Sequence, residues 1–236
     1  MLRLALSALA AVVGGCANVN YETTRAGTFS GEVAVVWLSG TKGSGDGTFV
    51  YVPTEAKPLT FRRPEGETKG RSITPGMMYT DGGSIPPFAR IVNGLTPWNY
   101  GPAYIVHDWL FRARQCLNDK STNPDYDALK DLDFQDSAEI IAEAIKALEA
   151  SGRVKKDQIS GALVTAAVTS PFSHRHWTAN GKCSEVSDED QQTALNAVGR
   201  KAVVGRETTT RFKLRTTGAI EEQTGQVVAI ISYDGL

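Results

Sequence analysis

A histidine and an aspartate stand side by side in an apolar stretch, as His107 and Asp108 in GPAYIVHDWLF. A histidine can act as a general base on water, and a neighbouring carboxylate can orient a side chain or bind a cation. Adjacent helical residues point about 100° apart, so both could still reach one site at the edge of a buried face. The structural alternative is that Asp108 pairs with Arg112 one turn further on.

A glycine-containing loop, MMYTDGGSIPP, precedes this pair. Gly82 and Gly83 permit positive φ and let the backbone approach a ligand closely. Asp81 and loop carbonyls could hold a hard cation, and the loop amides could bind an anion. Ser84, His107 and an aspartate would also suit a nucleophile, a base and an orienting group, although no G-x-S-x-G elbow is present. In the structural alternative, Asp81 caps its own turn.

Two more aspartates fall on the apolar face of a helix that we expect over residues 123–150. Asp133 and Asp136 share that face with leucines and an isoleucine at helical spacing. A buried carboxylate is costly unless it meets a partner. Two interpretations stay open: Asp136 or Asp133 orients His107, or the carboxylate makes a hydrogen bond to a loop backbone or to an arginine.

Strand-like segments flank the helical region. Short β-branched and aromatic runs fill residues 29–73 and 208–233, whereas helix start and stop signals fill residues 74–199. These patterns predict an α+β fold. Three to four helices in the middle region should pack on a small, mostly antiparallel sheet built from both ends of the chain.

The helix signals also set the expected boundaries. The helix with the His-Asp pair should begin at Pro102, a third helix should end at Pro171, and a fourth should run from a Ser187 cap to Gly199. His174 and His176 then follow the third helix. They could add a metal site, but we expect them in a polar loop at the helix end.

These segments resemble domain-of-unknown-function family 1353, which occurs in phages and bacteria. Its hallmarks are TD-x-x-S-I-P and HD-x-L-aromatic, and the resemblance covers about residues 73–177. The matched positions are Asp81, Ser84, Pro86, His107 and Asp108. Because the family has no assigned activity, the resemblance implies a site rather than a reaction.

The same order of motifs is similar to that of secreted calcium-dependent phospholipases. That similarity implies His107 as the general base, Asp108 as a metal ligand, Asp81 with its loop as the complementary ligands, and Asp136 or Asp133 as the orienting group. It implies calcium, or another divalent cation, as the cofactor.

The first fifteen residues follow the pattern of a secretory signal, with Arg3 before an apolar run of about ten residues. The following Val-Gly-Gly-Cys resembles a lipobox, which predicts lipidation of Cys16; the alternative is an ordinary cleaved signal beside a chance cysteine. Ala17, rather than aspartate, predicts sorting to the outer membrane. We expect residues 16–28 to form the lipidated cysteine and a polar tether, and residues 29–236 to form one domain.

Charge and cysteine content narrow the function classes. Removal of Arg3 with the signal leaves 24 of the 25 basic residues against 26 acidic residues. The sequence also has no stripe of basic residues, so we do not expect a nucleic-acid partner. The membrane, reached through the lipid, is the expected partner, and no protein partner is indicated. Cys116 and Cys183 predict a disulfide, worth roughly 4 kcal/mol in the chain-entropy model; two free thiols are the alternative.

Two classes of function remain. The first is a non-catalytic, phage-related envelope lipoprotein in which Asp81, Ser84, His107 and Asp108 form a buried polar latch. The second is a metal-assisted or general-base hydrolase acting on envelope phospholipid or peptidoglycan. The sequence slightly favours the latch.

Overall fold

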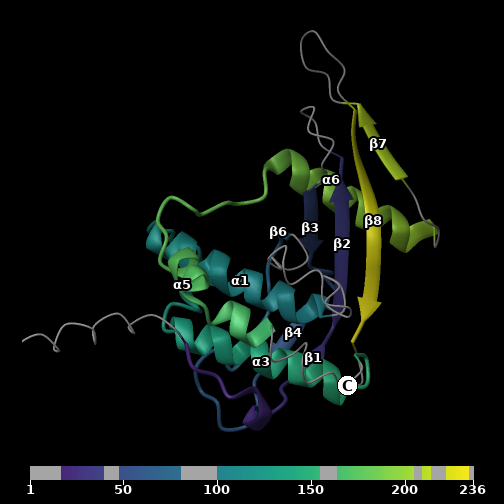
Figure 1. The fold of residues 1–236 in the computed structure, drawn as a ribbon. Helices are drawn as coiled ribbons and strands as arrows, with labels where there is room; N and C mark the ends of the chain where they lie inside the picture. The colour runs from purple at the N-terminus through teal and green to yellow at the C-terminus, as the bar shows by residue number, and fades with distance from the viewer. Residues whose placement is uncertain are drawn as a thin grey trace, which may run out of the picture.

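A computed structural model describes residues 17–39, 48–80, 100–154, 164–204, 209–213 and 222–233. Its helices lie on both sides of a long antiparallel sheet (Figure 1). The helical middle of the chain packs on strands from its two ends. The predicted α+β class is therefore confirmed.

The larger sheet has five strands in the order β6-β3-β2-β8-β7, and each neighbouring pair is antiparallel. A smaller sheet has the order β1-β4-β5. The strands of the larger sheet are β2 (Glu32–Leu38), β3 (Thr48–Val52), β6 (Met78–Thr80), β7 (Thr209–Lys213) and β8 (Glu222–Ser232). Those of the smaller sheet are β1 (Thr28–Ser30), β4 (Thr60–Arg62) and β5 (Ser72–Ile73).

The two ends of the chain meet in the larger sheet, as the sequence predicts. Strand β8 pairs with β2, and Val33 lies opposite Ile231. Gly31, between β1 and β2, has φ +89° and lies against the Pro58 carbonyl, where a Cβ would collide. Only glycine fits this turn without strain, and the turn carries the chain from one sheet into the other.

Both faces of β2 are buried. Val33 and Val35 belong to the main core with the middle helices, whereas Ala34 and Val36 pack with a second cluster around Ala194. Side chains alternate across a strand, so one continuous apolar run serves two layers. The sheet is thus the middle layer, and the helix α6 (Asp188–Val204) covers its second face.

The helix α1 (Gly101–Asn118) begins at the predicted proline, with Pro102 in its first turn. The single helix expected over 123–150 is wrong. The chain instead forms α2 (Pro124–Asp127), a turn, and then α3 (Phe134–Ala150), whose N-cap is Asp133.

The later helices also differ from the expectation. Pro171 starts the helix α5 (Pro171–Trp177) rather than only ending a preceding one, and Ser170 caps it. The polar loop expected around His174 and His176 is therefore helical. Helix α6 has the predicted cap, since Ser187 Oγ accepts from the Asp190 amide at 3.2 Å, but it continues past Gly199.

The first part of the expected tether is packed onto the domain. The 3-10 helix η1 (Tyr21–Thr23) buries Tyr21, whose side chain is 4% exposed. Its hydroxyl donates to Glu149 Oε1 at 2.8 Å, and Lys146 Nζ lies 4.0 Å from the ring centroid. A free polar tether is the wrong description of residues 17–27.

The predicted disulfide between Cys116 and Cys183 is present and closes a separation of 67 residues. The turn beside it is fixed by Asp119, whose carboxylate accepts backbone N–H bonds from Gly181, Lys182 and Cys183 at 2.6–2.9 Å. These bonds lower the pKa of Asp119. Cys183 therefore reaches the end of α1 through a well-bonded turn.

In the described part of the chain, every helix is too short or too polar to span a bilayer.

Candidate functional site

His107 lies in the middle of α1, half-buried, with its ring 4.6 Å from that of Phe111. Although the side chain keeps some exposed area, its Nε2 is covered and has no hydrogen-bond partner among the described residues. Burial without a charged partner lowers the pKa of His107 to about 4. The imidazole is therefore neutral at neutral pH and only weakly basic.

Asp108 connects α1 to the end of β6. Its Oδ2 accepts a hydrogen bond from Thr80 Oγ1 at 2.9 Å. Thr80 immediately precedes Asp81, so the predicted ligand loop starts beside Asp108. Asp81, Ser84 and Pro86 themselves lie outside the described residues.

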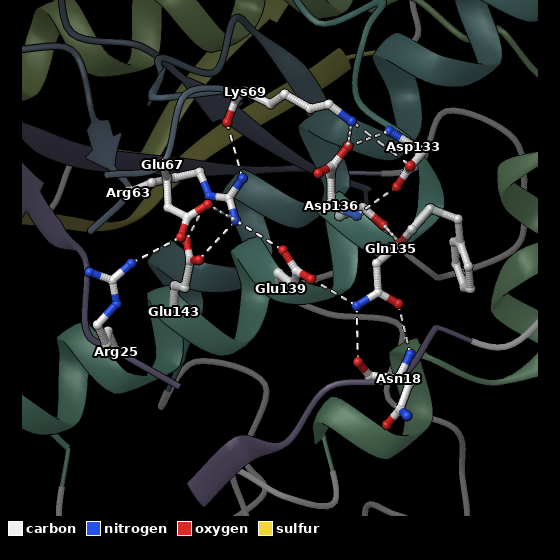
Figure 2. Close-up of polar contacts among 12 residues, drawn as sticks. Asn18, Arg25, Arg63, Glu67, Lys69, Asp133, Gln135, Asp136, Glu139 and Glu143 are labelled. Carbon is white, nitrogen blue, oxygen red and sulfur yellow. Dashed lines mark hydrogen bonds and ion pairs between the residues drawn. The ribbon is translucent and has the colours of Figure 1, made fainter. Parts of the chain in front are cut away.

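Asp133 and Asp136 form a capping box at the start of α3 (Figure 2). Asp133 Oδ1 accepts from the Asp136 amide, and Asp136 Oδ2 accepts from the Asp133 amide, both at 2.9 Å. Asp136 also accepts from Lys69 Nζ at 3.2 Å. These bonds satisfy amides that the first turn of a helix leaves unpaired.

The prediction that Asp136 or Asp133 orients His107 is therefore wrong. No hydrogen bond joins either aspartate to His107, and the backbone alternative is what the structure has. The sequence signal for it is an aspartate three residues before another acidic residue, ahead of an apolar helix.

A buried ion-pair network that no sequence pattern predicts is centred on Arg63, at the end of β4 (Figure 2). The Arg63 guanidinium donates from Nε and Nη2 to the two carboxylate oxygens of Glu143 on α3, each at 2.8 Å. It also contacts Glu139 at 3.3 Å and Glu67 at 3.5 Å, and donates to the Lys69 carbonyl at 3.0 Å. The network joins the smaller sheet to α3.

Arg63 is almost wholly covered, with 1% of its side chain exposed, and Glu143 has 7%. Burial raises the pKa of Glu143, and the Arg63 guanidinium opposes that rise. A five-donor fork that meets a carboxylate in two parallel bonds is a geometry suited to holding two elements together. Periodicity does not reveal such a pair, because its members lie eighty residues apart.

The candidate metal ligands do not come together among the residues that the structure describes. Among the described residues, no group of three or more His, Cys, Asp or Glu side chains is arranged to hold an ion. The ring centroid of His174 lies 5.0 Å from that of Phe134, whereas the ring centroid of His176 lies 4.6 Å from that of Phe172. The two histidines thus contact different rings. Asp81, one of the predicted calcium ligands, lies outside the described residues. Cys16, the predicted lipidation site, also lies outside them.

No family model, curated protein or solved structure matches this chain. The resemblances to family 1353 and to the phospholipases therefore stay predictions.

Proposed function

We propose that this chain is a lipoprotein of the bacterial envelope, anchored through Cys16 in the outer membrane, whose folded domain is a non-catalytic module. The observation that carries the proposal is the disulfide between Cys116 and Cys183. Disulfides persist in oxidising compartments and are rare in the cytosol. A disulfide-bonded domain behind a signal-like segment is consistent with export.

The polar residues around α1 fit a latch. Thr80 and Asp108 join the strand before the predicted loop to the helix after it. His107 contributes its ring to the packing against Phe111, and its lowered pKa makes it a weak base at neutral pH. In this proposal the bond between Thr80 and Asp108 holds the end of β6 against α1.

The anchoring proposal is tested with Cys16→Ala in full-length chains grown with labelled fatty acid. The wild type should carry the label and fractionate with the outer membrane. Cys16→Ala should lose the label and move to the soluble fraction. Cys116→Ser is the matched control, since it removes a cysteine but leaves the lipobox, and should stay labelled. Membrane retention of an unlabelled wild type would contradict the proposal.

A hydrolase remains the second candidate, because a neutral imidazole adjoins Asp108 where the predicted ligand loop begins. Its test uses phosphatidylethanolamine vesicles and purified peptidoglycan, with calcium and with chelator. Calcium-dependent cleavage that is lost in both His107→Ala and Asp81→Asn would support the hydrolase and reject the non-catalytic latch. A melting temperature that calcium leaves unchanged, together with no cleavage, favours the latch.

A further inference from the structure

The described chain begins on the surface of the domain, clamped to the start of α3. The Asn18 amide donates to Gln135 Oε1 at 2.8 Å, and Gln135 Nε2 donates to the Asn18 carbonyl at 2.9 Å (Figure 2). Ala17 and Val19 pack against the main core. The chain therefore reaches Ala17 without a slack segment.

Helix α5 lies beside this clamp. Phe134, the neighbour of Gln135, packs against His174 at 5.0 Å and against Trp177 at 6.2 Å. The residues just before α5 also lie close to the N-terminal segment, since Ala166 and Thr169 line the same hollow as residues 17–22. The start of the described chain and α5 thus occupy one side of the molecule, at the first turn of α3.

Helix α5 is held firmly on α1. Trp177 is buried, and the guanidinium carbon of Arg114 lies 5.1 Å from the centre of its ring. Gln115 Nε2 donates to the His176 carbonyl at 3.0 Å, and Asn118 Nδ2 donates to the Trp177 carbonyl at 3.0 Å. These contacts fix which side chains α5 turns outward.

The outward side of α5 is aromatic and basic. Phe172 is 67% exposed, the largest value among the large hydrophobic side chains that the structure describes. It stacks edge-on against His176, and Arg175 between them is also exposed. Aromatic rings with cationic side chains are the composition that settles at the headgroup level of a bilayer.

We propose that α5 is a membrane-contacting element, with Phe172 entering the headgroup region and Arg175 meeting lipid phosphates. This inference rests on the proposed lipidation. Cys16 adjoins Ala17, and one residue spans at most about 3.6 Å, so the acyl chains enter the bilayer next to α5. An anchor without slack fixes which face of the domain meets the membrane.

The test uses the full-length acylated chain, reconstituted in phosphatidylethanolamine–phosphatidylglycerol vesicles with brominated acyl chains. Bromine quenches tryptophan emission at membrane depth. Phe172→Trp adds a fluorophore at the proposed contact, and Leu195→Trp adds one at an exposed apolar position on α6. The added emission, relative to the wild type, should be largely lost for Phe172→Trp and kept for Leu195→Trp. Arg175→Glu should weaken the quenching of Phe172→Trp.

The outcomes separate the inference from the function on which it rests. Equal quenching at both positions, or none at Phe172→Trp in an acylated, vesicle-bound chain, overturns the role of α5 and leaves the anchor intact. A mass spectrum without acyl groups on Cys16 overturns both. Unchanged quenching with Arg175→Glu overturns the phosphate contact. Because Phe172 is exposed, its replacement should leave the melting temperature unchanged, which is measured alongside.

Discussion

At the scale of single residues, most of the polar groups expected to do chemistry, among the residues that the structure describes, hold the chain in place. Asp136 satisfies an amide of its own helix and binds Lys69. Asp108 accepts from Thr80. His107 is the exception, because its Nε2 is covered and no described residue pairs with it. Its burial should therefore lower the free energy of unfolding under conditions in which the unfolded chain can protonate it.

The first prediction concerns pH. The folded His107 has a pKa of about 4, below the ordinary value of 6.5. Between these values the unfolded chain binds a proton that the folded chain does not, so the free energy of unfolding falls as the pH drops, by up to about 3 kcal/mol. His107→Phe should remove this part of the loss. Urea melts from pH 7 to pH 4 give the comparison, and equal slopes for both chains would contradict it.

The second prediction concerns the capping box. Asp133→Ala should cost about 1 kcal/mol, as loss of an N-cap typically does. Asp136→Ala should cost more, because it removes both the bond to the Asp133 amide and the largely buried carboxylate that accepts from Lys69. Chemical denaturation measures both. Asp131→Ala, an exposed aspartate just before α3, is the control and should change stability little. Stability unchanged in both capping variants would refute the box.

At the scale of elements, apolar spacing predicts which residues are buried but does not show where one helix ends and the next begins. Leu129 and Leu132 are buried at helical spacing, yet they lie in the turn between α2 and α3. A turn that keeps its leucines inward looks like a helix in sequence. Only the acidic pair at Asp133 and Asp136 marks the true start of α3, and that pattern also fits a buried carboxylate with a catalytic partner.

The strands and the disulfide were predictable for physical reasons. β-branched runs at both ends of the chain predicted a shared sheet, and two cysteines remained once Cys16 was set aside for the proposed lipidation. The Arg63 network was not, because pairing across eighty residues leaves no local pattern. The position of α5 beside the N-terminal segment depends on packing around Phe134, which the sequence does not specify either.

The third prediction concerns that network. Arg63→Ala should destabilise the domain by about 3–5 kcal/mol, because it leaves Glu143 buried without its partner. Arg63→Met with Glu143→Leu should cost much less, since no buried charge remains. Urea denaturation of both variants makes the comparison. A double variant as unstable as the single one would show that the pair contributes more than mutual neutralisation.

At the scale of the whole molecule, one sheet gathers both ends of the chain and separates two apolar clusters. The disulfide works at this scale too, because it closes a long loop that contains α2, α3 and α5. The cross-link restricts the unfolded chain more than any local contact does.

The fourth prediction follows from that loop. Cys116→Ser with Cys183→Ser should lower the free energy of unfolding by roughly 4 kcal/mol in the chain-entropy model. Thermal melts of the wild type with and without a thiol reductant should differ in the same direction, while the double variant should be insensitive to the reductant. A reductant-sensitive double variant would contradict this assignment.

The clamp between Asn18 and Gln135 has a mechanical consequence. In the proposed lipoprotein, a pull on the acyl chains of Cys16 would meet the clamp at Asn18 two residues later. The tension passes at once into the first turn of α3, and the side chain of Tyr21, wedged against Glu149 and Lys146, resists peeling. Extraction of the lipid from a bilayer would thus transmit force directly to the folded core.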